Sequence, residues 1–90
     1  MSDPNYYAII SRERVTELAE GSDAVGLWAR KMLDGIDEEA EFLRGARVYF
    51  NSAGQDKRRF ALASLANMFG AKREDLKRYL LFKGLVNLMD

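Results

Sequence analysis

The chain has 90 residues, of which 48% are hydrophobic and 31% are charged, a composition that supports one folded domain and argues against intrinsic disorder. Fourteen basic and fourteen acidic residues give a formal net charge of zero. The chain contains neither cysteine nor histidine, which excludes disulfides, thiolate nucleophiles, histidine acid–base catalysis and the usual zinc sites.

The first residues bear on the cellular location. The longest apolar run is Tyr6–Ile10, which is much shorter than a membrane span, and no basic stretch followed by an apolar core marks a signal peptide. We therefore expect a soluble, cytoplasmic protein without a membrane partner. Residues 6–10 fit either a short strand or the start of a helix introduced by Asp3 and Pro4.

Glycines separate three expected helices in the first half of the chain. Ser11 is expected to cap a helix that runs through Glu20 and ends at Gly21. Ser22 or Asp23 caps the second helix, and Asp37 caps a third that continues to Asn51–Gly54. The apolar faces of the three helices are expected to contain Val15, Leu18 and Ala19; Val25, Trp28, Met32 and Leu33; and Ala40, Leu43, Ala46, Tyr49 and Phe50.

Three acidic residues, Glu38, Glu39 and Glu41, follow the Asp37 cap, and we interpret them as first-turn residues favoured by the helix dipole. The segment from Asp34 also suggests a calcium-binding loop. Both possible registers fail, because a loop starting at Asp34 has Ile36 at its third position and one starting at Asp37 has Phe42 where glycine is needed. We expect no metal and no other cofactor.

Two helices are expected in the second half. Asp56 caps the first, and Gly70 ends it. The second begins around Arg73. Their expected apolar residues are Phe60, Leu62, Leu65, Ala66 and Phe69 in the first, and Leu76, Tyr79, Leu80 and Val86 in the second. Two short helices joined by a brief glycine-containing connection have the layout of a helix-turn-helix.

Residues 62–81 resemble the helix-turn-helix signature of DNA-binding regulators. Ala66 stands where that signature has a small residue for helix contact, and Gly70 stands at its turn. The signature's buried positions are occupied by Leu65, Phe69, Ala71, Leu76 and Tyr79. The resemblance concerns this supersecondary unit and no particular family. It implies that the nucleic-acid-binding residues are Arg58, Arg59, Lys72, Arg73, Lys77 and Arg78.

The charges are divided unevenly along the chain. Residues 1–55 contain six basic and ten acidic residues, a net charge of −4, whereas residues 56–90 contain eight basic and four acidic residues, a net charge of +4. This division is typical of an acidic half joined to a half that binds polyanions. It also fits two halves that neutralise each other within one fold or across a dimer, and the sequence leaves both interpretations open.

The sequence thus predicts an all-α, single-domain helical bundle of four to five helices over residues 1–90, with a C-terminal helix-turn-helix-like hairpin. The resemblance implies a small protein that binds duplex DNA and regulates transcription or another DNA transaction. The alternative is a protein-binding adaptor or inhibitor of the phage or plasmid type. Such a protein would dock on a host protein through its acidic N-terminal half, with Tyr6, Tyr7 and Trp28 as exposed anchors.

Two further expectations concern the C-terminus and catalysis. Residues 80–89 are too apolar for a surface tail, so they either pack onto the first helices or form the interface of a homodimer. An enzyme is not expected, because the serines lack a histidine partner and carboxylates at helix starts are usually caps. A phosphate-binding glycine loop is also lacking.

Overall fold

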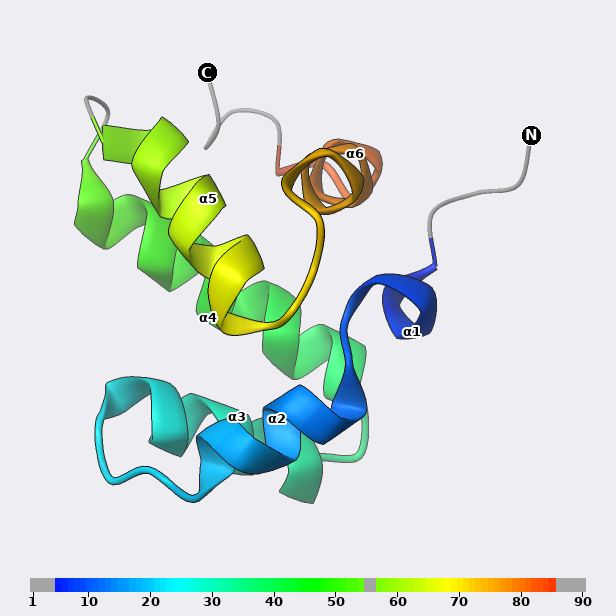
Figure 1. Ribbon diagram of the computed structural model, residues 1–90, viewed down its shortest axis with the longest axis vertical. Helices are drawn as coiled ribbons and strands as arrows, with labels where there is room; N and C mark the ends of the chain where they lie inside the picture. The colour runs from blue at the N-terminus through cyan, green and yellow to red at the C-terminus, as the bar shows by residue number, and fades with distance from the viewer. Residues whose placement is uncertain (1–4, 55–56, 86–90) are drawn as a thin grey trace.

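The computed structural model describes residues 5–54 and 57–85, and these residues form six α-helices and no strand. The helices are α1 (Tyr6–Ile9), α2 (Arg12–Ala19), α3 (Ala24–Asp34), α4 (Glu38–Ala53), α5 (Arg58–Met68) and α6 (Arg73–Phe82), as Figure 1 shows. The predicted all-α class is confirmed, with six helices in place of the four to five expected. The additional helix is α1, a single turn formed by the residues for which strand and helix were both open.

Short polar side chains begin the first four helices. The capping residues are Asn5, Ser11, Asp23 and Asp37, each of which accepts a hydrogen bond from a backbone N–H of the first turn at 2.9–3.3 Å. The Ser11 and Asp37 caps are confirmed, and Asp23 caps α3 in preference to Ser22. The predicted cap Asp56 lies outside the described residues, and α5 begins after Lys57 without a side-chain cap.

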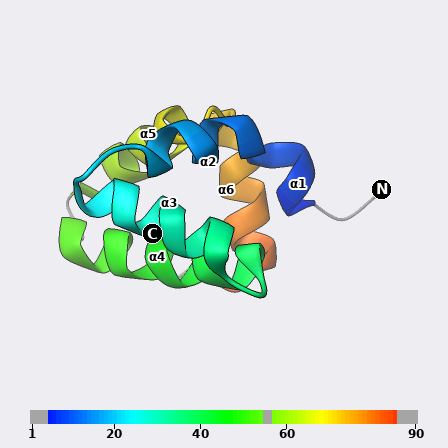
Figure 2. The same ribbon diagram turned by 90° about the horizontal axis from the view of Figure 1, so that it is seen from below.

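Helix α4 occupies the centre of the fold. Helices α2 and α3 pack together on one side of it, and α5 and α6 pack together on the other, as Figure 1 shows. In the perpendicular view of Figure 2, α3 and α4 run side by side, and α1 lies next to α6. The molecule measures 32 × 31 × 20 Å. None of the helices in the described residues is long and apolar enough to cross a membrane.

An aromatic cluster forms the middle of the core, with Phe42 of α4 at its centre. The Phe42 ring lies 5.2–5.6 Å from the rings of Tyr6, Trp28 and Phe69, measured between centroids. Tyr79 lies slightly further away, at 6.3 Å. The cluster therefore joins α1, α3, α4, α6 and the end of α5 through one fully buried ring.

The buried face of α4 differs from the prediction. Its buried residues are Glu38, Phe42, Ala46 and Phe50, which repeat every four residues. Ala40 was expected in the core and is exposed, whereas Leu43 and Tyr49 are half-buried at the edges of this face. A helix with apolar residues around much of its circumference can bury any of several faces. Packing of Phe42 against the other aromatic rings determines which face of α4 is buried.

The apolar face of α5 was also partly wrong. Phe60 was expected in the core, but 73% of its surface is exposed, and Ala61 is buried in its place. The other predicted residues of this helix, Leu62, Leu65, Ala66 and Phe69, are all buried. Adjacent residues are rotated by about 100° around a helix. Because Ala61 faces the core, the preceding Phe60 points into solvent.

The C-terminal apolar stretch divides between core and surface. Leu80 and Leu85 are buried, whereas Leu81 and Phe82 are exposed. Packing onto the protein's own core is therefore confirmed for the first two. Val86 and the residues after it lie outside the described part of the chain.

Candidate nucleic-acid interface

The connection between α5 and α6 is a tight, glycine-dependent turn. Gly70 has a φ of +66°, a left-handed conformation that favours glycine. Its N–H donates to the Asn67 carbonyl at 3.3 Å, and the Ala71 N–H donates to the Ala66 carbonyl at 2.8 Å. These two bonds are the Schellman pattern of a helix C-terminus, which satisfies the last carbonyls of α5 before α6 starts two residues later.

The apolar residues assigned to the helix-turn-helix signature face the interior of the protein. Among the positions assigned to the helix-turn-helix signature, Leu65, Phe69, Leu76 and Tyr79 are fully buried and Ala71 is half-buried. Ala66, the small residue at the helix contact, is 2% exposed. The remaining faces of α5 and α6 are therefore the ones that a ligand can reach.

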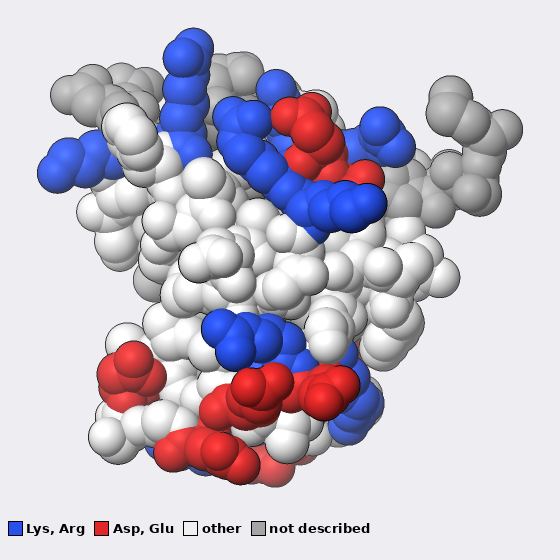
Figure 3. Space-filling model, in the orientation of Figure 1, with Lys and Arg blue, Asp and Glu red and all other residues white. Residues whose placement is uncertain are grey.

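Most of the predicted binding residues lie on those outer faces. Those with exposed side chains are Arg59, Lys72, Arg73, Lys77 and Arg78. The backbone of Arg58 begins α5, but its side chain lies outside the described part of the structure. Figure 3 shows lysine and arginine side chains gathered at the end of the molecule that α5 and α6 form, with acidic side chains between them.

Residues 57–82 contain seven basic and two acidic residues, a net charge of +5. Both acids, Glu74 and Asp75, lie in the first turn of α6. Arg73 Nη1 lies 3.2 Å from Glu74 Oε1, so the acid partly neutralises one of the cations. Lys72 occupies the N-cap position without a side-chain cap bond. The surface is thus positively charged overall, and its positive charge is lowest at the start of α6.

Contacts from the first half of the protein hold this hairpin in place. Arg14 of α2 donates from Nε to the Met68 carbonyl at 2.9 Å, which places a cation at the C-terminus of α5. Glu39 of α4 receives two groups from α6: the Tyr79 hydroxyl donates to its Oε2 at 2.5 Å, and Lys83 Nζ lies 3.1 Å from the same oxygen. The C-terminal ends of α5 and α6 are therefore both held against other helices.

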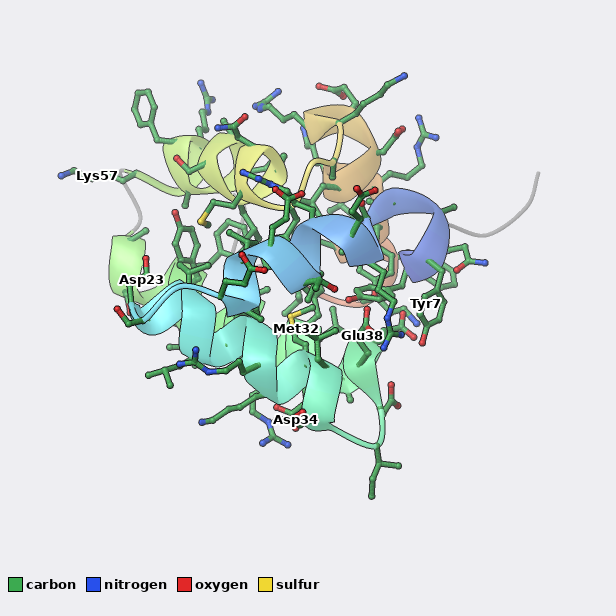
Figure 4. The ribbon with its side chains drawn as sticks, turned by 60° about the horizontal axis from the view of Figure 1, so that its bottom comes forward. Tyr7, Asp23, Met32, Asp34, Glu38 and Lys57 are labelled. Carbon is green, nitrogen blue, oxygen red and sulfur yellow. The ribbon has the colours of Figure 1, made fainter. Side chains whose placement is uncertain are left out.

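A second tyrosine–glutamate pair lies beside the first. The Tyr6 hydroxyl donates to Glu38 Oε2 at 2.7 Å, and Arg12 Nη1 lies 3.2 Å from the other carboxylate oxygen. Glu38 is buried, whereas Tyr7 is exposed and points away from the protein in Figure 4. Burial raises the pKa of both Tyr6 and Tyr79, and the neighbouring carboxylates raise it further, so both phenols remain donors.

The roles of Glu38 and Glu39 were not predicted. The two residues do occupy the first turn of α4, but each also ties a distant helix to that turn. Their tyrosine partners are 32 and 40 residues away in the sequence, where no local pattern connects them. Among the described residues, no group of three acidic side chains lies close enough together to hold a metal ion.

The anchors named for a protein-binding adaptor do not form one exposed set. Tyr6 is 2% exposed and belongs to the core, which corrects its expected role as a surface anchor. Trp28 is half-buried between α3 and α4, and only Tyr7 is largely exposed.

No protein-family model, curated protein or solved structure matches this chain.

Proposed function

We propose that the protein binds duplex DNA through the α5–α6 hairpin and acts as a small regulator of transcription or another DNA transaction. The observation that carries the proposal is the arrangement of this hairpin. The apolar residues of the signature are buried around a left-handed glycine turn, while Lys72 at the N-cap and Arg73, Lys77 and Arg78 on the second helix are exposed. In helix-turn-helix proteins the second helix enters the major groove.

The charges suit phosphate contacts more than base reading. Lys77 and Arg78 lie in the second turn of α6 and are exposed, and Arg59 is exposed at the start of α5. Arginine and lysine at such positions neutralise phosphates and set the orientation of the protein on the duplex. Arginine is also the side chain that most often reads guanine in the major groove, so Arg73 is the residue we assign to base contacts.

Fluorescence anisotropy with a labelled random duplex tests the proposal directly. We expect binding at low salt that weakens steeply as salt is added, with a slope of roughly −0.9 in log–log form for each phosphate contact. The double variant Lys77→Ala, Arg78→Ala should reduce the magnitude of that slope by roughly 2, because two contacts are lost.

A matched control removes the same charge elsewhere. Lys31 on α3 and Arg47 on α4 are exposed, so Lys31→Ala with Arg47→Ala changes the net charge equally without touching the hairpin. We expect this variant to keep the salt slope of the original protein. An equal decrease of the salt slope in both double variants would refute the proposal, and so would the absence of binding at about 50 mM salt.

A further inference from the structure

Helices α3 and α4 leave an apolar groove along their outer side. The groove has a volume of about 460 Å³, within the range of ligand-binding clefts. Trp28 and Gly45 line the groove, together with the exposed aliphatic side chains of Leu27 from α3 and Val48 from α4. It is separate from the α5–α6 hairpin, because all of its lining residues come from α3 and α4.

The Trp28 side of the groove is held rigidly. The Trp28 ring stacks on Phe42 at a centroid distance of 5.6 Å, and its Nε1 donates to the Glu41 carbonyl at 3.1 Å. A Cβ at position 45 would lie 2.0 Å from the indole, so only glycine lets the ring lie against α4. The groove is therefore a pre-formed feature of the packing, which lowers the cost of binding.

Charge is confined to one end of the groove. Lys31, Glu41 and Arg44 line that end, and Ala24, Val25 and Ser52 line the other. Arg44 Nη1 lies 3.6 Å from Glu41 Oε1, so these two charges offset each other. Lys31 is exposed and makes no ion pair among the described residues. The charged end thus has an excess positive charge, centred on Lys31.

We propose that this groove binds an amphipathic helix of a partner protein, with an aspartate or glutamate of that helix over Lys31. The stretch of α3 from Ala24 to Lys31 is about 10 Å long, the distance between positions i and i+7 of a docked helix, so apolar side chains at i, i+3 and i+4 cover the apolar part of the groove and position i+7 lies over Lys31. The acid one turn beyond them then supplies the charge that complements Lys31.

A second copy of this protein fits the charge pattern less well. In a two-fold pair, each charged end meets either the same end of the other copy or its uncharged end. Neither arrangement gives Lys31 an acidic partner beyond the Glu41 that Arg44 already holds. A heterologous helix with an acidic residue satisfies both the apolar and the charged part of the groove.

Selection from a phage-displayed library of helical peptides tests the proposal. The peptides have about 16 residues, enough for about four helical turns, and peptides that bind the support without the protein are removed by counter-selection. We expect enrichment of sequences with three apolar residues at helical spacing and an acid at one end. Trp28 is the single tryptophan of the chain and lies in the groove, so its fluorescence reports binding directly.

Matched variants distinguish binding in the groove from nonspecific binding to exposed apolar side chains. Ile36 is fully exposed and does not line the groove, so Ile36→Lys should bind selected peptides like the original protein, whereas Val48→Lys should lose at least tenfold in affinity. Lys31→Glu should weaken binding by up to about fivefold, and a peptide with lysine in place of its acid should restore it. Circular dichroism and urea unfolding check that each variant is folded.

Three results would overturn the proposal: no enrichment of peptides that depend on Val48, enrichment of basic residues at the position over Lys31, or self-association that Val48→Lys abolishes. The last result would identify a second copy as the occupant. Each is independent of the DNA-binding proposal, because Val48→Lys leaves every residue of the hairpin unchanged.

Discussion

Tyr79 of α6 donates its hydroxyl hydrogen bond to the Glu39 carboxylate in the first turn of α4, across 40 residues of sequence. Lys83 reaches the same carboxylate oxygen from the end of α6. The pair joins the second helix of the candidate DNA-binding hairpin to the central helix of the fold. It therefore contributes both to stability and to the orientation of the basic surface.

Removing this hydroxyl should destabilise the protein without disturbing its packing. Tyr79→Phe keeps the buried ring and loses one hydrogen bond to a charged group, a cost of about 1.5 kcal/mol in the free energy of unfolding. Urea unfolding followed by circular dichroism measures the change. Tyr7→Phe is the control, because Tyr7 is exposed and its hydroxyl makes no hydrogen bond among the described residues. Identical unfolding midpoints for the two variants would contradict this role of Tyr79.

Gly45→Ala should destabilise the protein even though alanine is the better helix former. The helix propensity gain is about 1 kcal/mol, but the new Cβ would lie 2.0 Å from the Trp28 indole. Overpacking of this kind costs about 1–3 kcal/mol, so we expect a net loss of stability together with a change in Trp28 fluorescence. Ser64→Ala, on the exposed face of α5, is the control and should not lower stability. A stabilised Gly45→Ala protein with unchanged fluorescence would show that the ring does not lie against α4.

The turn of the hairpin can be tested with two substitutions at one position. Gly70→Ala should cost about 1–2 kcal/mol of unfolding free energy, because φ is +66° there. The cost comes from the backbone, since the nearest side-chain atom to an added Cβ is Arg14 Cγ at 3.7 Å, an ordinary contact. Asparagine tolerates this conformation better, so Gly70→Asn should be the milder change in urea unfolding. If alanine and asparagine have the same effect, the turn does not depend on the left-handed conformation.

Glu74→Gln should strengthen DNA binding. The acid is exposed in the first turn of α6 and pairs with Arg73, so its removal lowers repulsion of phosphates and frees a cation. A unit charge about 8 Å from a phosphate in water is worth roughly 0.5 kcal/mol, or about a twofold gain in affinity at low salt. Anisotropy titrations measure it, with Glu13→Gln on α2 as the matched control. A gain of the same size in both variants would mean that the start of α6 does not face the DNA.

The elements that depend on local interactions could be predicted from the sequence alone. Ser11 and Asp37 cap helices because their side chains bond an N–H three residues ahead, so the signal lies within one turn. Gly70 ends α5 for a similarly local reason. The hairpin pattern was visible because apolar residues recur at helical spacing within each helix, Leu65 and Phe69 before the turn and Leu76 and Tyr79 after it.

Local patterns did not predict which of several possible faces each helix buries, because that choice depends on packing between helices. Phe42, and not the predicted Ala40, lies in the core, because rings from α1, α3, α6 and the end of α5 surround it. Likewise Ala61, and not the predicted Phe60, faces the core, and Phe60 is exposed. The same convergence paired Glu38 with Tyr6 and opened the groove beside Trp28. These contacts join residues that are far apart in the sequence. Helical periodicity indicates the apolar face of a helix, but it does not indicate which other helix packs against that face.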